Sequence, residues 1–292
     1  MHKAGFVNII GNPNVGKSTL MNALVGEKLS IITSKSQTTR HRIMGLFNGE
    51  DFQIVYSDTP GIVNPHYKLH ESMMGYVNLA IQDADLFLLV TEVGETLKNH
   101  ETLEKVINSS VPVILLINKI DLSNQEMVAE KIEYWQKEIP RAIIIPTSAL
   151  EKFNLELVFN TILELLPENP PYFPKDELTD KSMRFFVSEI IREKLLLYYQ
   201  KEIPYSCEVV VETFQEESKI DKIFTVIYVE RDSQKAILIG HQGSMLKKVG
   251  TEARKDIEEF TSKKCFLEIR VKVLKDWRNN ENSLQRFGYK NK

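Results

Sequence analysis

Cysteine is scarce in this sequence, with only Cys207 and Cys265 among 292 residues. Two isolated cysteines cannot build a disulfide framework, and no clustered ligands accompany them that would make a zinc site. The scarcity of cysteine therefore favours a reducing cytoplasm as the compartment of this protein.

Long hydrophobic runs are also lacking. No apolar stretch approaches the roughly 20 residues that a membrane-spanning helix needs. The first apolar run, residues 6–10, is short and leads into a glycine-containing loop, which is typical of a folded domain and not of a signal or transit peptide. The content of 42% hydrophobic and 26% charged residues is ordinary for a globular protein, and the length suits about two domains.

Charge is unevenly distributed along the chain. Residues 1–179 contain 15 basic and 22 acidic side chains, a net charge of −7, whereas residues 180–292 contain 22 and 18, a net charge of +4. Within the second part, residues 233–292 carry a net charge of +7 from 14 basic and 7 acidic side chains. This asymmetry indicates two domains with different partners, and it favours a polyanion for the second, although a solvated basic face has the same composition.

The first part of the sequence alternates between apolar, β-rich runs and amphipathic stretches. Near-continuous apolar runs are typical of a parallel sheet whose two faces are covered by helices. We therefore expect an α/β fold with a mixed, mostly parallel sheet and helices on both faces. Strands are expected at residues 6–10, 52–57, 86–91, 113–117 and 142–146, and an amphipathic helix at Gln125–Glu138.

Four prolines fall within residues 167–174, which cannot continue a helix or a central strand. We place a semi-rigid linker there. The chain then divides into a domain of residues 1–168, a linker of residues 169–181 and a second domain of residues 182–292. In the second domain the pattern predicts a small α+β fold in the order α-β-β-α-α-β. The expected helices are 182–201, one that ends at Gly240, and 243–260, and the expected strands are 205–214, 222–231 and 265–274.

Residues 11–18, Gly-Asn-Pro-Asn-Val-Gly-Lys-Ser, match the phosphate-binding loop G-x-x-x-x-G-K-[ST] between an expected strand and an expected helix. The glycines let backbone N–H groups turn toward phosphates, and the helix N-terminus adds its dipole. We expect Lys17 to pair with the β- and γ-phosphate oxygens and Ser18 to ligate Mg²⁺. The residues predicted to bind nucleotide here are Asn12, Pro13, Asn14, Val15, Gly16, Lys17, Ser18 and Thr19.

The base is predicted to be guanine. Asn118-Lys119-Ile-Asp121 follows an apolar strand, where the Asp121 carboxylate can accept both N–H donors at N1 and the exocyclic amine of guanine. Adenine presents an acceptor at N1 and lacks that amine, so it would leave the carboxylate unpaired. Ser148 and Ala149 end the next strand and are expected to offer backbone N–H groups to the guanine carbonyl.

Two further segments are predicted to meet Mg²⁺ and the γ-phosphate. Asp58-Thr-Pro-Gly61 ends a strand, so Asp58 is expected to bind Mg²⁺ through water and the Gly61 N–H to meet the γ-phosphate. The polar stretch 33–42 contains Thr38 and Thr39, and a switch segment needs one threonine hydroxyl that joins Mg²⁺ only when the γ-phosphate is present. We prefer Thr39. Lys17, Thr39 and Gly61 are the predicted catalytic residues.

These motifs resemble those of the translation-factor-related class of P-loop GTPases, and the details of residues 11–18, 37–40 and 58–61 are similar to the Era family. Ile62 occupies the place where Ras-like GTPases have a water-orienting glutamine, and its side chain has no donor or acceptor. The resemblance implies K⁺ beside the phosphates, held by Asn14, in place of that glutamine. Slow intrinsic hydrolysis of GTP to GDP is expected either way, because no residue here is an obvious base.

The second domain contains Gly240-His-Gln-Gly243 between two expected helices. A lone G-x-x-G is often only a turn, but the helix and strand order, the aliphatic residues before it and the lysines after it resemble a type II KH domain. Such a loop lets a helix pair approach a single-stranded RNA backbone. The predicted RNA-binding residues are Ile237, Gly240, His241, Gln242, Gly243, Lys247 and Lys248.

One GTPase domain, a proline-rich linker and one KH domain together resemble the Era family over nearly the whole chain. The resemblance implies a monomeric factor in assembly of the small ribosomal subunit that binds the 3′ end of its rRNA, with peripheral association at the inner membrane. Two alternatives stay open. One is an RNA chaperone that holds nucleotide without cycling, and the other is a GTPase that docks proteins at a membrane through its basic C-terminal part.

Overall fold

The computed structural model of the chain describes residues 1–96 and 101–289. It divides into two compact units, one formed by Met1–Asn64 and Met73–Asp180 and the other by Pro65–Ser72 and Lys181–Lys292. Among the described helices, none combines the length and the apolar character needed to cross a membrane.

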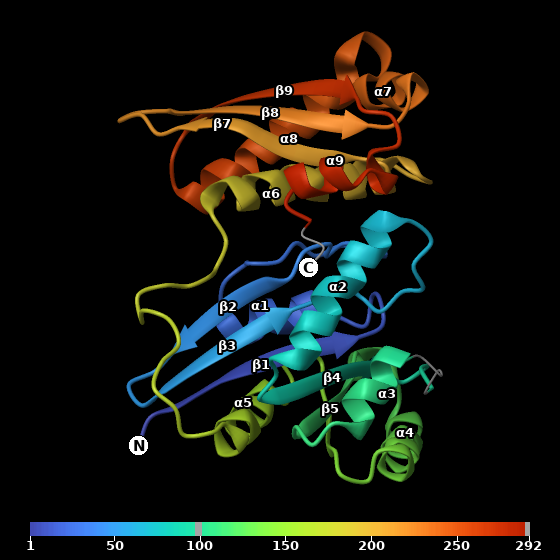
Figure 1. The fold of residues 1–292 in the computed structure, drawn as a ribbon, viewed down its shortest axis with the longest axis vertical. Helices are drawn as coiled ribbons and strands as arrows, with labels where there is room; N and C mark the ends of the chain where they lie inside the picture. Colours follow the sequence, from blue (N-terminus) through green and yellow to red (C-terminus); the bar gives the residue numbers. More distant parts are fainter. Residues whose placement is uncertain (97–100, 290–292) are drawn as a thin grey trace. The chain divides into compact units, whose positions relative to one another are not determined.

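The first unit contains a six-stranded sheet in the order β2-β3-β1-β4-β5-β6, in which only β2 is antiparallel to its neighbour (Figure 1). The mixed, mostly parallel sheet predicted from the sequence is therefore confirmed. Its strands are β1 Lys3–Gly11, β2 Ile43–Asn48, β3 Phe52–Asp58, β4 Leu86–Glu92, β5 Val113–Asn118 and β6 Ile143–Pro146. The helices of this unit are α1 Lys17–Val25, α2 Lys68–Gln82, of which residues 68–72 are assigned to the other unit, α3 Glu101–Asn108, α4 Gln125–Glu138 and α5 Leu155–Leu165.

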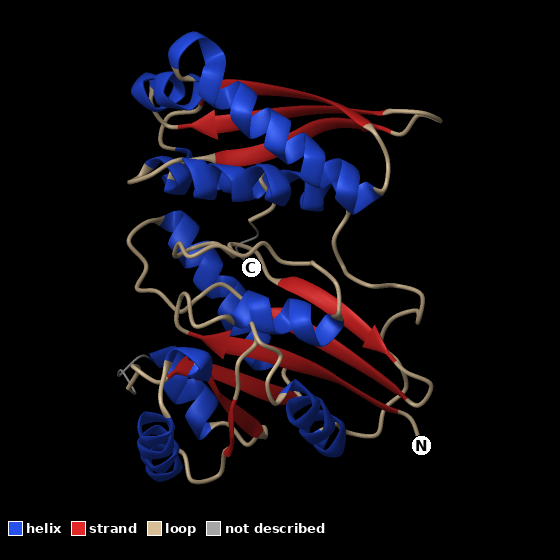
Figure 2. Ribbon diagram, turned by 180° about the vertical axis from the view of Figure 1, so that it is seen from behind, coloured by secondary structure: helices blue, strands red, loops and turns tan. Residues whose placement is uncertain are grey.

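Helices cover both faces of this sheet (Figures 1 and 2). On one face, α2, α3 and α4 pack against β4 and β5 in a core that includes Val77, Val106 and Trp135. β5 is buried at every position, which is why its sequence reads as a continuous apolar run. Burying each large aliphatic side chain of this kind contributes about 1.5–3 kcal/mol.

One strand, β2, was not predicted from the sequence. β2, Ile43–Asn48, pairs antiparallel with β3 at the edge of the sheet, and the two are joined by a tight turn in which the Gly49 N–H donates to the Phe52 carbonyl at 3.0 Å. Its pattern of buried and half-buried residues includes a glycine, Gly45, which weakens any strand signal in the sequence.

The predicted linker packs against the sheet of the first unit. Its residues up to Asp180 lie along β2 and β3, where Gln53 Oε1 accepts the backbone N–H groups of Tyr172 and Phe173 at 2.7 and 3.0 Å. The Leu46 N–H donates to the Leu178 carbonyl at 2.9 Å. The prolines prevent a helix. The extended chain that results accepts and donates hydrogen bonds at the backbone groups that the edge of the sheet would otherwise leave exposed.

The second unit has the predicted order α-β-β-α-α-β. Its helices α6 Met183–Tyr198, α7 Asp232–Ile239 and α8 Ser244–Thr261 accompany a sheet of β7 Glu208–Gln215, β8 Asp221–Val229 and β9 Cys265–Val273. β8 pairs antiparallel with β7 and parallel with β9, and α6 and α8 lie beside this sheet (Figure 2). Side chains of α6 and α8 share one core with the sheet. The tail, with the short helix α9 Glu281–Arg286, is anchored by Trp277, whose indole N–H donates to the Ser206 carbonyl at 3.0 Å.

Candidate nucleotide site and RNA-binding loop

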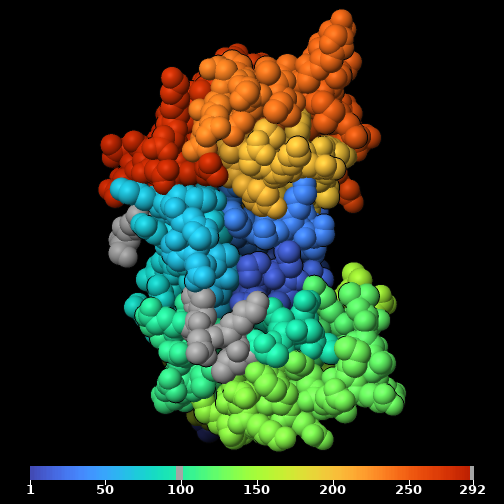
Figure 3. Space-filling view, turned by 90° about the vertical axis from the view of Figure 1, so that its right-hand side faces the viewer, coloured from blue at the N-terminus to red at the C-terminus, as the bar shows by residue number. Residues whose placement is uncertain are grey.

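The predicted nucleotide motifs follow the C-terminal ends of parallel strands. Residues 11–18 come after β1, Asp58 ends β3, Asn118 ends β5 and Ser148 follows β6. Because these strands are parallel, their C-terminal ends lie at one edge of the sheet, where α/β folds bind ligands. Figure 3 shows blue atoms of the N-terminal part reaching the surface between the cyan atoms of the α2 region and the green atoms of later segments.

The phosphate loop is held in a shape that only glycine permits at residue 16. Gly16 has a φ of 99°, in a region that side chains rarely adopt. A Cβ atom there would lie 2.3 Å from Nδ2 of Asn118. Asn118 in turn donates from Nδ2 to the Val15 carbonyl at 2.8 Å. The asparagine of the guanine motif therefore braces the phosphate loop across the sheet edge.

Lys17 is buried at the start of α1. Its Nζ donates to the carbonyls of Gly11 and Asn12 at 3.1 and 2.7 Å. Burial lowers the pKa of this amine to about 8, while the charges of Asp58 and Glu95 act in the opposite direction. A buried ammonium that donates to two carbonyls is suited to receive anionic oxygens, as expected for the phosphate-binding lysine.

Three hydroxyl and carboxylate oxygens meet at the predicted Mg²⁺ site. Ser18 Oγ lies 2.8 Å from Thr39 Oγ1 and donates to Asp58 Oδ2 at 2.7 Å, and Thr39 Oγ1 donates to the same oxygen at 3.3 Å. Thr38 instead donates to the Lys35 carbonyl at 2.7 Å. The structure thus places the preferred threonine, Thr39, with the other predicted ligands, although its role in catalysis stays a prediction.

The chemistry of this oxygen cluster fits Mg²⁺. Asp58 Oδ1 is buried and has no hydrogen-bond partner among the described residues. Burial raises the pKa of the Asp58 carboxyl, and the hydrogen bond from Ser18 and the charge of Lys17 offset part of that effect. A buried carboxylate that accepts too few hydrogen bonds is costly unless a cation joins it. Hard oxygen donors of this kind are those that Mg²⁺ prefers.

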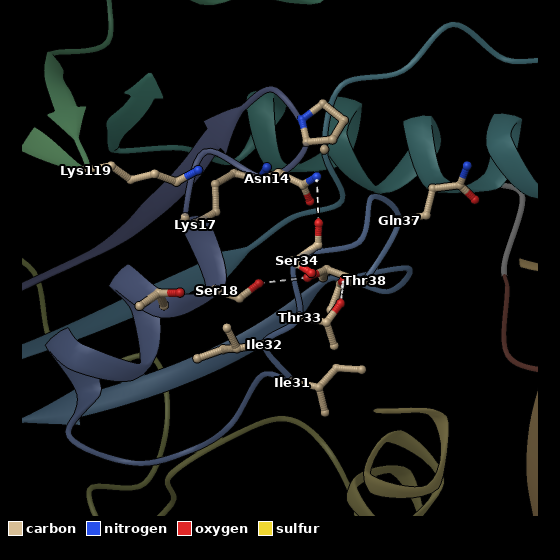
Figure 4. A pocket seen from close by; sticks show the side chains of 15 residues that line it. Asn14, Lys17, Ser18, Ile31, Ile32, Thr33, Ser34, Gln37, Thr38 and Lys119 are labelled. Carbon is tan, nitrogen blue, oxygen red and sulfur yellow. Dashed lines mark hydrogen bonds between the residues drawn. The ribbon is translucent and has the colours of Figure 1, made fainter. Parts of the chain in front are cut away.

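A cavity of about 470 Å³ opens beside these groups (Figure 4). Besides predicted residues, its walls include Ile31 and Ile32 and part of the polar stretch 33–42, which was predicted to be a switch segment. In Figure 4 the side chain of Asn14 approaches Ser34, to whose carbonyl its Nδ2 donates at 3.3 Å. The lining residues that were not predicted individually are Ile31, Ile32, Thr33, Ser34, Gln37 and Thr38.

The guanine motifs are linked to each other. Asn118 Oδ1 accepts the Ala149 N–H at 2.9 Å, and Ser148 Oγ donates to Asp121 Oδ1 at 2.5 Å. Lys119 has a φ of 61° and its Nζ lies 2.8 Å from Glu92 Oε2. These contacts place the loops after β5 and β6 together, with the Asp121 carboxylate oriented by Ser148.

Gly61 lies close to the phosphate loop. A Cβ atom at Gly61 would lie 2.7 Å from Pro13 Cα, so only glycine allows this approach. The next N–H, that of Ile62, donates to the Gly11 carbonyl at 3.2 Å, and the Ile62 side chain is buried in the core. Residue 62 therefore contributes no side-chain polar group to the site, in keeping with the sequence prediction.

Two carboxylates at the end of β4 were missed. Glu95 Oε1 accepts from Asn12 Nδ2 at 2.9 Å, and Glu92 pairs with Lys119 as described above. Their only sequence signal is a pair of acidic residues directly after an apolar strand. Glu95 and Glu92 thus contact the second residue of the phosphate loop and the lysine of the guanine motif.

The predicted RNA-binding loop forms a tight turn between α7 and α8. Gly240 has a φ of 71°, and a Cβ atom there would lie 2.8 Å from the Met245 side chain. Gly243 has a φ of 76° and faces open space within 4 Å. Gln242 also adopts a positive φ, of 49°. The geometry therefore requires glycine at residue 240 for space and favours it at residue 243 for conformation only.

The side chains around this loop are exposed. Ile237 is 51% exposed, which is high for an isoleucine at the end of a helix. His241, Gln242 and Lys247 are also exposed, and the Lys248 ammonium lies 4.2 Å from the centre of the Tyr198 ring. An apolar side chain at the end of α7, the glycines of the turn and two lysines in the first turns of α8 are the groups that a single-stranded nucleic acid needs.

Comparisons with known proteins agree over both units. Residues 6–119 match a family described as 50S ribosome-binding GTPase, and residues 202–278 match the KH domain family. GTPase Era of Syntrophus aciditrophicus is 44% identical, covering 99% of this chain and 96% of that protein. GTPase Era of Clostridium kluyveri is 43% identical, covering 99% and 100%.

Solved structures are similar over the same length. Era in complex with MgGDPNP and nucleotides 1506–1542 of 16S ribosomal RNA superimposes with a TM-score of 0.93 at 37% identity, covering 99% of both chains. An Aquifex aeolicus Era variant bound to GDP and aluminium fluoride has the same TM-score and identity, covering 98% and 99%.

Proposed function

This chain belongs to the Era family of GTPases, and on that premise we propose that it is a nucleotide-controlled switch that binds the 3′ end of small-subunit ribosomal RNA and assists assembly of that subunit. The RNA-binding part of this proposal rests on the Gly240–Gly243 turn, with the exposed Lys247 and Lys248 beside it. The relative crystallised with a 16S rRNA fragment supports it.

GTP binding and hydrolysis are the activity of the first unit. The backbone of the phosphate loop and Lys17 are suited to the β- and γ-phosphates, and Asp121 to the guanine edge. Ser18, Thr39 and Asp58 would hold Mg²⁺, which neutralises phosphate charge when bound. Because Thr39 lies on the segment between α1 and β2, its position links that segment to the nucleotide state.

Hydrolysis at this site proceeds without a glutamine at residue 62. Asn14 lines the cavity from a backbone with a φ of 66°, and its amide is suited to hold a K⁺ ion beside the phosphates. Single-turnover GTP hydrolysis should then be faster in K⁺ than in Na⁺ buffer, and Asn14→Ala should lose the difference. Equal wild-type rates in the two buffers would remove this role for Asn14.

RNA binding is tested with a fluorescent oligonucleotide of the 16S rRNA 3′ end and a scrambled control. Gly243→Asp adds a negative charge where nothing clashes, so affinity should fall at least about tenfold with nucleotide affinity intact. Gly243→Asn is the matched control, because asparagine tolerates the same backbone conformation without charge. Equal losses in both variants would show that the loop acts only through its shape.

The salt dependence separates phosphate contacts from shape. If Lys247 and Lys248 each contact one phosphate, the double alanine variant should lower the slope of log affinity against log salt by about 1.4. An unchanged slope would mean that neither lysine contacts a phosphate. Phosphate release that small ribosomal subunits do not stimulate would favour the rival function, a nucleotide-bound RNA chaperone that does not cycle.

The scarcity of cysteine supports a cytoplasmic location, and a monomer is the simplest working form. Peripheral association with the inner membrane is the remaining property that the family resemblance implies. Fractionation of cells with and without a high-salt wash tests the location and the membrane association. Recovery in the soluble fraction alone would exclude membrane association, and salt-sensitive recovery with membranes would support it.

A further inference from the structure

A buried polar cluster lies at the C-terminal end of the switch segment, on residues that the nucleotide motifs do not include. Arg42 is 7% exposed and its guanidinium donates in three directions. Nε donates to Ser57 Oγ at 2.6 Å, Nη2 to Asn8 Oδ1 at 3.2 Å, and both Nη1 and Nη2 to the Asp83 carboxylate at 2.6 and 2.9 Å. The guanidinium thus joins β1, β3 and the residue that follows α2.

The partners of Arg42 are themselves fixed. Asn8 and Ser57 are fully buried and face each other across the β1–β3 pair. Asn8 Nδ2 donates to Asp83 Oδ1 at 2.8 Å and also to the Ala80 carbonyl, which leaves Asn8 Oδ1 to accept from Arg42. A planar guanidinium that forms a two-pronged bond to a carboxylate has one well-defined orientation.

This cluster lies close in sequence to the Mg²⁺ ligands but on the other face of the sheet. Side chains of successive strand residues point to opposite faces, so Ser57 and Asp58 point away from each other. Asp58 points to α1 and Ser18, whereas Ser57 points to the side of α2 and Asp83. The chain therefore passes from one face to the other between Thr39 and Arg42.

We propose that Arg42 is a positioning residue that fixes the C-terminal end of the switch segment and thereby holds Thr39 at Ser18 and Asp58. With residue 42 clamped to β1, β3 and Asp83, the three residues back to Thr39 have little freedom, and the hydroxyl is presented at low entropic cost. Release of the clamp leaves the motif residues in place but removes this fixed end of the switch segment.

Arg42→Lys tests this role, because lysine keeps the charge and loses the two-pronged geometry. The readouts are the affinities of fluorescent GDP and of a fluorescent GDPNP at high and low Mg²⁺. GDPNP affinity should fall about tenfold and require more Mg²⁺, as for loss of one charge-assisted hydrogen bond. GDP affinity should change less than about twofold, since Thr39 is needed only with the γ-phosphate.

Hydrogen exchange of peptides covering residues 33–47 gives a second readout that does not depend on turnover. In GDPNP-loaded protein these amides should exchange at least about tenfold faster in Arg42→Lys than in wild type. Asp83→Asn is a milder variant in case Arg42→Lys fails to fold, because the Asp83 side chain is 42% exposed. It should shift both readouts in the same direction by a smaller factor.

Arg141→Lys is the matched control. Arg141 lies in the same unit and donates to the carbonyls of Val106, Ile107 and Val111, at the start of β6 and away from the nucleotide loops. It should lower the melting temperature without changing the ratio of GDPNP to GDP affinity. If Arg42→Lys behaves in the same way, or weakens both nucleotides equally, Arg42 only stabilises the fold and the proposal is wrong.

Discussion

Lys17 should make nucleotide affinity depend on pH in the range around pH 8. Its amine is buried, and burial lowers its pKa to about 8 when phosphates are absent. The nucleotide binds the charged form of the lysine, since phosphate oxygens raise the pKa again. Affinity should therefore be high below pH 8 and fall as pH rises through it.

The size of the effect follows from that pKa. Roughly nine tenths of the amine is charged at pH 7 and roughly a quarter at pH 8.5, so the dissociation constant of GDP should rise about fourfold between them. This corresponds to about 0.8 kcal/mol. Asp58 and Glu95 are the charged groups whose fields act on the amine and raise its pKa against the effect of burial.

The assay is equilibrium titration of fluorescent GDP at pH 7.0, 7.5, 8.0 and 8.5, with constant Mg²⁺ and salt. Lys17→Arg is the control, because arginine stays charged throughout this range. Its affinity can be weaker overall but should not change with pH. A flat wild-type profile would refute the reasoning, and an equal slope in Lys17→Arg would assign the dependence to another group.

Other substitutions test the remaining parts of the site. Thr39→Ala should reduce the rate of GTP hydrolysis by at least about tenfold in single-turnover assays, whereas Thr38→Ala should change it less than about threefold, because only Thr39 contacts Ser18 and Asp58. Asp121→Asn should lose its preference for GTP over XTP in competition binding; a preference kept at the wild-type margin would contradict the assignment of Asp121. Gly16→Ala should lower the melting temperature even without nucleotide, since its Cβ would overlap the Asn118 amide, and an unchanged melting curve would show that the loop relaxes freely.

Local sequence patterns predicted most of the fold. The apolar runs of β1, β4 and β5 are continuous because both sheet faces are covered, so their composition alone indicated a parallel sheet. The order of helices and strands in the second unit was predicted from changes in the hydrophobic period along the sequence and from glycines at turns. β2 and the packing of residues 169–180 were not predicted, because the conformation of an edge strand and of an extended segment depends on the neighbouring strand.

By itself, the sequence determined the nucleotide and the two-domain plan, and it predicted the metal ligands, because contiguous motifs hold backbone N–H groups and side chains at fixed local spacing. Only the tertiary structure decided between Thr38 and Thr39, since the distance from Thr39 to Ser18 and Asp58 joins three separate segments. The same holds for Glu95 and for the Arg42 cluster. A single charged residue has no periodic signal, and its partner is known only once distant strands lie side by side.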